Sequence, residues 1–307
     1  PGMANGLANL HNARRARVPM VNVVGDHATS HRQYDAPLTS DIARYAGQVS
    51  GWVRSVSHVQ AMGSDTAAAI EAARTAPGQI ATLITPADCT WLEGATPGVV
   101  SEPPAPARVE ERAVEAATAA LRSGEPAMLL LGGAALQEEV LADAGRIAAG
   151  TGARIAAPTF FARLPRGAGR VAVERLPYPI DQVVEFMQGV RHLILVGADA
   201  PVSFFAYPGK PSWLTPEGAQ LHVLARPEQD LPDALARLAE AVGARARPRL
   251  QDHLPLDLPT GALTPEAVCQ AAAALLPEGC VVVEEALSSM MPAWHATVTS
   301  APHDWLV

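Results

Sequence analysis

Titratable side chains follow directly after an apolar segment near the start of the chain. Residues 18–25 read VPMVNVVG, and the polar residues that come next include Asp26, His27 and His31. Histidine changes its charge near neutral pH, so this cluster could bind a carboxylate or transfer a proton in acid–base catalysis. Asp26 could favour the charged form of a neighbouring imidazole, provided that their side chains converge. Asp26, His27 and His31 are therefore the candidate catalytic residues.

The two histidines also allow other interpretations. His27 and His31 have the i, i+4 spacing of a metal-binding pair on a helix, but the residues between them follow a strand end. No third ligand is evident nearby, so we assign no metal ligand. The two residues could also be ordinary loop histidines without a chemical role.

A second candidate group lies near the end of the sequence, after the apolar run 280–283. Glu284 and Glu285 could form an acid pair with a raised pKa. Alternation along a strand would instead send one carboxylate to each face, leaving Glu285 for a site and Glu284 for a surface partner. Ser288 and Ser289 could cap a helix, or their hydroxyls and nearby backbone N–H groups could bind a phosphate.

The first group needs a parallel sheet to position it. The β-branched run 18–25 predicts a buried strand, and a helix is expected before it from Asn5 to Arg17, after a turn at Pro1-Gly2. Further strands are predicted at 51–56 and 80–85, with a helix at 66–75 capped by Ser64 or Asp65. Open α/β sheets bind ligands beyond the carboxyl ends of their strands, which is where Asp26 and His27 are expected.

Strands and helices continue to alternate between residues 109 and 246. This spacing predicts a second parallel, doubly wound sheet, with the irregular loop 158–177 between two of its elements. Gly132-Gly133 and Gly197-Ala198 resemble the turns of dinucleotide-binding folds, but neither completes a G-x-G-x-x-G motif. Ordinary turn formation explains these glycines better than a bound nucleotide.

Proline-rich segments divide the chain into three predicted domains. Residues 93–108 and 247–260 are expected to be extended linkers, which leaves domains at 1–92, 109–246 and 261–307. A chain of 307 residues is long enough for several domains, and 49% hydrophobic with 18% charged residues is an ordinary globular composition.

Charge and cysteine content restrict the class of protein further. The net charge of −8 argues against nucleic-acid binding. The cysteines, Cys89, Cys269 and Cys280, are far apart and form no C-x-x-C pair, so neither a disulfide framework nor a zinc site is indicated. A reducing cytoplasm is the expected location. No apolar run reaches the roughly 18 to 20 residues that a membrane-spanning helix needs, and no signal-peptide pattern is present.

Three stretches carry a further signal: Pro1-Gly2-x-x-Asn5, residues 25–42 and the segment that ends in Ser288-Ser289. They resemble motifs of thiamine-diphosphate-dependent enzymes of the acetolactate synthase, benzoylformate decarboxylase and pyruvate decarboxylase family. Pro1-Gly2-x-x-Asn5 looks like the end of the family's G-P-G-x-x-N turn beside the aminopyrimidine ring. The stretch that ends in Ser288-Ser289 looks most like the benzoylformate decarboxylase pattern N-E-S-T-S-T-T. Residues 25–42 resemble the acetolactate synthase segment G-Q-V-P-T-S-L-I-G-T-D-A-F-Q-E-A-D-I without a gap. The residues shared with that segment are Gly25, Thr29, Ser30, Asp35, Ala36, Asp41 and Ile42.

The resemblance implies an α/β fold with parallel doubly wound sheets. A central Rossmann-like domain, 109–246, would lie between two partial thiamine-diphosphate-binding domains: the C-terminal part of a pyrimidine-binding domain, 1–92, and the N-terminal part of a diphosphate-binding domain, 261–307. The implied reaction decarboxylates a 2-oxo acid and passes the enamine to a proton or to a second carbonyl. The implied cofactor-binding residues are Pro1, Gly2, Asn5, Glu285, Ser288 and Ser289.

The same resemblance leaves several points open. Mg²⁺ is implied, but its G-D-G…N-N motif and the activating glutamate are expected outside these 307 residues, so this chain alone is expected to be inactive. The central domain holds FAD in acetolactate synthases and is empty in benzoylformate decarboxylases. A homodimer or homotetramer is implied because family sites lie between two subunits. The alternative function is a non-catalytic nucleotide-binding or regulatory α/β protein, based on Gly132-Gly133 and the missing motifs.

Overall fold

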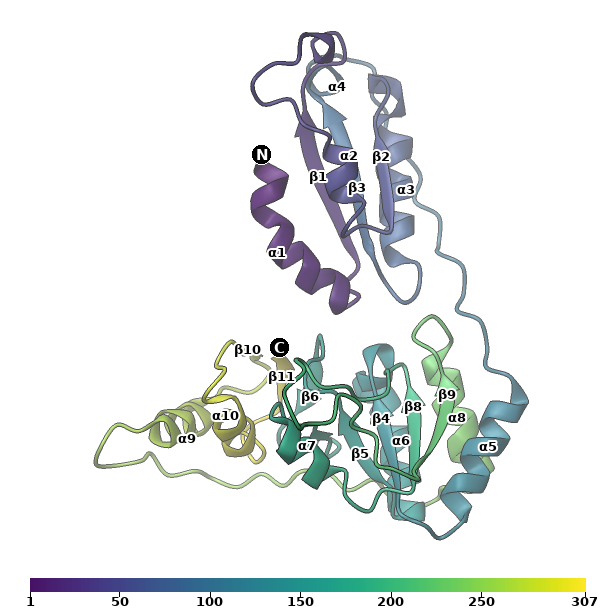
Figure 1. The fold of residues 1–307 in the computed structure, drawn as a ribbon, viewed down its shortest axis with the longest axis vertical. Helices are drawn as coiled ribbons and strands as arrows, with labels where there is room; N and C mark the ends of the chain where they lie inside the picture. Colours follow the sequence, from purple (N-terminus) through teal and green to yellow (C-terminus); the bar gives the residue numbers. More distant parts are fainter. The chain divides into compact units, whose positions relative to one another are not determined.

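The computed structural model describes residues 1–307, which form two compact units (Figure 1). The first unit is Pro1–Pro106 and the second is Ala107–Val307. Each contains a parallel sheet with helices packed against it, which confirms the predicted fold class. None of the helices combines the length and the apolar character that are needed to cross a membrane.

The first unit is built on a three-stranded parallel sheet with the order β1-β3-β2. Its strands are β1 (Met20–Asp26), β2 (Trp52–Ser55) and β3 (Ile80–Pro86). Every residue of β3 is buried, as expected for the central strand of a sheet covered on both faces. The helices of this unit are α1 (Gly2–Arg15), α2 (Ile42–Ala46), α3 (Met62–Arg74) and α4 (Ala87–Trp91), with 3₁₀ turns at η1 (Arg32–Tyr34) and η2 (Val59–Ala61).

The sequence predicts the first residues of two helices in this unit, α1 and α3, incorrectly. Helix α1 begins directly after Pro1, without a separate turn, because the Asn5 N–H already donates to the Pro1 carbonyl at 3.3 Å. Helix α3 begins at Met62, so neither Ser64 nor Asp65 caps it. Asp65 lies within the helix and pairs with Arg54 at 2.9 Å.

The second unit contains a five-stranded parallel sheet with the order β7-β5-β4-β8-β9. Strand β4 (Ala127–Leu131) is central and fully buried. Its alternate residues face opposite layers: Leu129 and Leu131 belong to the core shared with helices α5, α6 and α8, whereas Met128 and Leu130 pack with α7. The other elements are β5 (Arg154–Ala157), β7 (Glu174–Arg175), β8 (His192–Val196), β9 (Gln220–Ala225), α5 (Glu111–Arg122), α6 (Glu138–Thr151), α7 (Ile180–Phe186) and α8 (Leu231–Ala241), with η3 (Gly133–Leu136) between β4 and α6.

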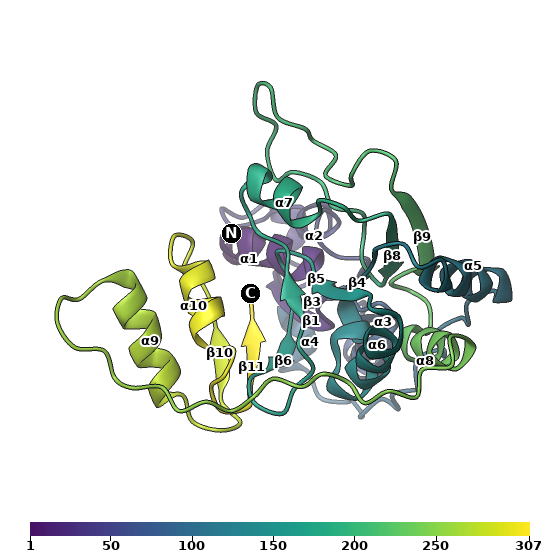
Figure 2. The same cartoon turned by 90° about the horizontal axis from the view of Figure 1, so that it is seen from below.

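The C-terminal residues pack onto this unit through a small second sheet (Figure 2). Its order is β10-β11-β6, in which β10 (Val281–Val283) and β11 (His303–Leu306) are parallel and β6 (Leu164–Arg166) is antiparallel to β11. Helices α9 (Pro265–Leu275) and α10 (Met290–Ala296) accompany it. The predicted irregular loop 158–177 is therefore wrong in part, because it contains β6 and β7.

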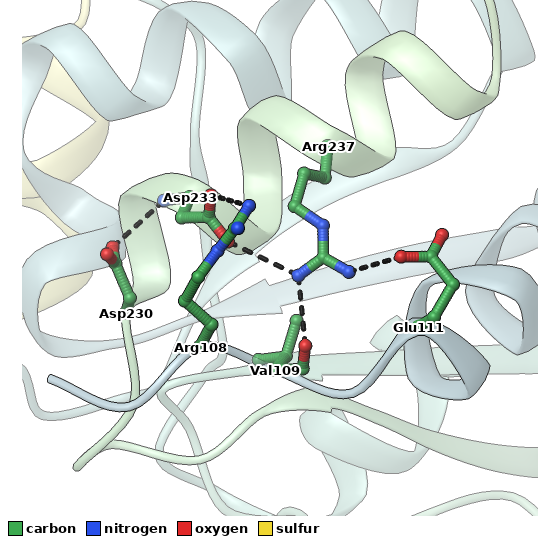
Figure 3. Close-up of polar contacts among 6 residues, drawn as sticks. All are labelled: Arg108, Val109, Glu111, Asp230, Asp233 and Arg237. Atoms are coloured by element: carbon green, nitrogen blue, oxygen red, sulfur yellow. Dashed lines mark hydrogen bonds and ion pairs between the residues drawn. The ribbon is translucent and has the colours of Figure 1, made fainter.

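Hydrogen bonds and ion pairs link residues 108–111, at the start of the second unit, to α8 (Figure 3). The Arg108 guanidinium donates to both carboxylate oxygens of Asp233, at 2.8 and 3.1 Å. Arg237, one turn further along α8, also reaches Asp233 and pairs with Glu111 at 2.5 Å. The hydrogen bond from Arg108, which is the largest cause, lowers the pKa of Asp233 below its ordinary value. The carboxylate of Asp230 caps the same helix by accepting the Asp233 N–H at 3.0 Å.

Packing explains the glycines that end β4 and β8. A Cβ atom on Gly132 would lie 2.5 Å from the carbonyl oxygen of Gly197, and one on Gly197 would lie equally close to Leu231 Cδ1. The Gly132 N–H donates to the Val196 carbonyl at 2.9 Å, so it takes part in the sheet. These contacts support the interpretation of the glycines as turn residues.

Replacing Gly132 with alanine should destabilise the second unit. Because the nearest obstacle is backbone, we expect Gly132→Ala to lower the free energy of unfolding by about 1–3 kcal/mol, the usual cost of overpacking. Gly150→Ala is the matched control: it lies in α6, its Cβ would meet only Ala244 Cα at 3.8 Å, and alanine favours helix. Urea-induced unfolding compares the two, and equal stability of both variants would contradict this packing argument.

Candidate active site

The three parallel strands of the first unit end at one edge of their sheet. The register pairs Asp26 at the end of β1 with Pro86 at the end of β3, and Ser55 of β2 with Ile84. Asp88 follows β3 within two residues. The carboxyl edge therefore carries polar side chains from all three strand ends, which is the edge where α/β sheets bind ligands.

Asp26 organises the loop that follows β1. Its Oδ1 accepts the backbone N–H of His27 at 2.7 Å, and its Oδ2 forms an ion pair with Arg32 Nη2 at 2.8 Å. Arg32 also approaches Ser55 Oγ at 3.4 Å, which links this loop to the end of β2. The Asp26 carboxylate is thus engaged by a backbone group and a guanidinium, and it makes no contact with an imidazole.

The rings of His27 and His31 lie side by side on this loop. Their centroids are 5.5 Å apart, and the ring of Tyr34 lies 5.7 Å from that of His31. His27 is half-buried and His31 is exposed. The structure therefore brings the three predicted catalytic residues together, while their catalytic role remains a prediction. No three His, Cys, Asp or Glu side chains are arranged as a metal site anywhere in the 307 residues.

Asp88 joins the same edge, although the sequence did not single it out as a site residue. The Thr29 N–H donates to its Oδ1 at 3.0 Å, and the Thr29 hydroxyl donates to its Oδ2. The hydroxyl hydrogen bond is the main cause of an Asp88 pKa below the ordinary value of 3.8. Its position directly after a strand end, opposite the loop of the neighbouring strand, is the signal that could have identified it.

The predicted cofactor-binding residues fall into two groups in different units. Pro1, Gly2 and Asn5 form the exposed first turn of α1. The second group lies in the loop between β10 and α10, where Glu285 and Ser288 are exposed and Ser289 is half-buried. Ser289 precedes α10, but its hydroxyl makes no capping hydrogen bond, so the helix-cap interpretation is not realised.

The prediction that Glu284 faces a surface partner is wrong. Its side chain is only 6% exposed and pairs with the fully buried Arg175 at 2.6 Å. A second arginine, Arg166, is buried beside it without a carboxylate partner. Burial, followed by the positive charge of Arg175, lowers the pKa of Arg166 to about 9. Sequence reasoning missed both arginines because they lie in the segment interpreted as an irregular loop.

The hydrogen bond from Thr29 to Asp88 gives a testable pKa shift. In Thr29→Val, which lacks the donor hydroxyl, we expect the pKa of Asp88 to rise toward 3.8. The pKa of Asp88 is lower in the folded than in the unfolded protein, so the contact with Thr29 stabilises the fold at pH values above the unfolded-state pKa. This stabilisation is lost as the pH falls through the folded-state pKa. Carboxyl-carbon NMR titration measures the shift. Thr90→Val is the control, since its hydroxyl donates to the Ala87 carbonyl; an unchanged Asp88 pKa in Thr29→Val would contradict the assignment.

No protein-family model matches the sequence. The chain is, however, 50% identical over 306 residues to the protein described as "Putative acetolactate synthase large subunit IlvX" of Mycobacterium tuberculosis (strain ATCC 25618 / H37Rv). That match covers 100% of this chain and 59% of the relative, so the chain spans about three fifths of the length of the curated relative.

Solved structures of similar fold cover the chain almost completely. The thiamine diphosphate-dependent 4-hydroxybenzoylformate decarboxylase of Rhodococcus jostii RHA1 matches with a TM-score of 0.77 at 19% identity, over 99% of this chain and 62% of its own. Benzoylformate decarboxylase from Polynucleobacter necessarius matches with a TM-score of 0.76 at 18% identity, over 99% and 61%. The predicted resemblance is thereby confirmed: the chain is homologous to an acetolactate synthase-like protein and has the fold of thiamine-diphosphate-dependent enzymes.

Proposed function

We propose that the chain is part of a thiamine-diphosphate-dependent enzyme that decarboxylates a 2-oxo acid, after which the former keto carbon is captured by a proton or by a second carbonyl. The observation that carries this proposal is the 50% identity, along the whole chain, to the protein described as "Putative acetolactate synthase large subunit IlvX". The polar carboxyl edge of the first sheet supports it, because this edge presents acid–base and cationic groups that suit a small anionic substrate.

The residues proposed for the cofactor fit its chemistry. When bound, thiamine diphosphate would supply the nucleophilic carbon that attacks the keto group and would accept the electrons released with CO₂. The hydroxyls of Ser288 and Ser289 form no hydrogen bond within the chain and could donate to the diphosphate. The exposed side chains of Asn5 and Glu285 make no hydrogen bond within the chain either. Mg²⁺ would neutralise the diphosphate, and no residue of this chain is assigned to it.

The roles proposed for the loop after β1 follow from its contacts. His27 is the proposed acid–base residue, because its ring nitrogens make no hydrogen bond within the chain and remain able to exchange a proton with the substrate. His31, whose ring lies beside it, is proposed as a second polar contact. Asp26 and Arg32 are proposed to hold the loop in place, and the half-exposed Arg32 could also attract the substrate carboxylate.

The comparisons favour this enzyme over a non-catalytic nucleotide-binding protein. Each of the solved structures described above is named as a decarboxylase. Nucleotide binding rested on Gly132-Gly133, and close packing against Gly197 accounts for the first of these glycines. Cytoplasmic location and assembly as a homodimer or homotetramer remain part of the proposal.

The flavin content of the full-length protein distinguishes a central domain without FAD from one that holds FAD. We expect the purified protein to carry FAD well below one per subunit, because the turns after β4 and β8 are poor in glycine and close against each other. A visible absorbance spectrum after purification measures this. A stoichiometric flavin band would contradict the expectation and would favour the version in which the central domain holds FAD.

Replacing His27 tests the catalytic proposal directly. In the full-length protein, supplied with thiamine diphosphate and Mg²⁺, His27→Ala should lower kcat for CO₂ release by about 10²-fold or more, the usual loss when acid–base assistance is removed. Cofactor affinity should change little, because His27 is not proposed to contact it. Pyruvate and benzoylformate are the first substrates to assay.

The matched control is His11→Ala, which removes an exposed histidine from α1. It should keep wild-type kcat and stability within about 0.5 kcal/mol, as expected for a surface substitution. Wild-type kcat in His27→Ala would contradict the catalytic role. Absence of cofactor-dependent CO₂ release from every 2-oxo acid tested would contradict the proposed function itself.

A further inference from the structure

Two buried arginines hold the two ends of the loop that carries Glu285, Ser288 and Ser289. We propose that Arg175 and Arg166 are positioning residues: they fix this loop from both sides and so set the affinity for the diphosphate group without touching it. The inference rests on the proposed function for the identity of the ligand. The geometry of the two arginines stands independently of it.

Arg175 holds the end of the loop that leaves β10. Its Nη1 donates to Glu284 Oε2 at 2.6 Å, and its Nε donates to the Thr159 carbonyl at 2.8 Å. Glu284 comes directly after β10, and its own N–H donates to the Leu306 carbonyl at 2.9 Å, continuing the pairing with β11. The Arg175 and Glu284 side chains are 0% and 6% exposed, so water competes little for this pair.

Arg166 holds the other end of the loop through α10. Its Nη2 donates to the Trp294 carbonyl at 2.7 Å and its Nη1 donates to Thr297 Oγ1 at 2.9 Å. Trp294 lies in the last turn of α10 and Thr297 is its C-cap residue, so the guanidinium occupies the place where helix carbonyls lack partners. The Arg166 guanidinium carbon also lies 3.5 Å from the centroid of the Trp294 ring.

The same tryptophan connects the two arginines. The Arg175 guanidinium carbon lies 5.4 Å from the centroid of the Trp294 ring, and both arginines come from the segment between β5 and α7. One stretch of the central region therefore contacts the chain immediately before the loop and immediately after α10. Ser289 directly precedes α10, so a shift of this helix would move the serine with it.

The loop itself has few contacts that could hold it in place. Leu287 is 84% exposed, and the side chains of Glu285, Ser288 and Ser289 make no hydrogen bond within the chain. Its conformation therefore depends on its anchored ends. A phosphate-binding loop that is held in place in advance loses less entropy when the ligand binds, which raises affinity.

Amide hydrogen exchange and calorimetry on the full-length protein test this proposal together. In Arg175→Met and Glu284→Gln, the peptide that contains 285–289 should exchange about tenfold faster than in the wild type, without cofactor present. Thiamine diphosphate, titrated with Mg²⁺, should bind at least tenfold more weakly. Thr297→Val, a milder change that removes one Arg166 contact, should shift both readouts in the same direction and keeps the test decisive if Arg175→Met fails to fold.

Arg163→Gln is the matched control. Arg163 lies just before β6 and pairs with Asp304 at 2.5 Å, but it is 67% exposed and contacts neither the loop nor α10. It should leave both readouts at wild-type values. Unchanged loop exchange in folded Glu284→Gln and Thr297→Val would overturn the proposal. Faster exchange in a protein that binds no thiamine diphosphate would support the anchoring of the loop while contradicting the proposed function.

Discussion

The parallel pairing of β1 with β3 is the constraint on which the candidate active site depends. Because Asp26 and Pro86 are partners in register, the loop after β1 and the residues after β3 reach the same edge. Thr29 can then donate to Asp88, and the Asp26–Arg32 pair can approach the end of β2. A slip of one residue in β1 would turn its side chains to the opposite face and separate these groups.

The sequence predicted those parts of the fold that rest on continuous apolar runs. Strand β1 was located within two residues, but the prediction that it is buried is wrong: it lies at the edge of the sheet, its residues are half-buried or exposed, and Val23 is 61% exposed. Strand β3 was found within one residue because buried parallel strands are apolar on both faces. The site residues after β1 could be predicted from the sequence because the end of a strand can be located from the strand itself.

Other features depend on contacts between residues far apart in the sequence. Strand β6 is three residues long and exists because β11, more than a hundred residues later, pairs with it. Asp65 is buried within α3 because Arg54 pairs with it, and Glu284 is buried because Arg175 does. Removing one partner of a pair that is buried on both sides, as Arg175–Glu284 is, typically costs about 3–5 kcal/mol, whereas the Arg54 side chain is 47% exposed and its pair contributes less. Tertiary pairing can therefore outweigh the local preference of a charged residue for the surface.

Calorimetric titration of the full-length protein with thiamine diphosphate and Mg²⁺ tests the central claim most directly. The account predicts saturable binding at one site per chain. Replacing both loop hydroxyls in Ser288→Ala/Ser289→Ala should weaken binding by about tenfold or more, since each hydrogen bond to a charged group contributes about 1.5–3 kcal/mol. Ser101→Ala, in an exposed position, should bind as the wild type does. Absence of saturable binding, or equal affinity in the double variant, would contradict the account.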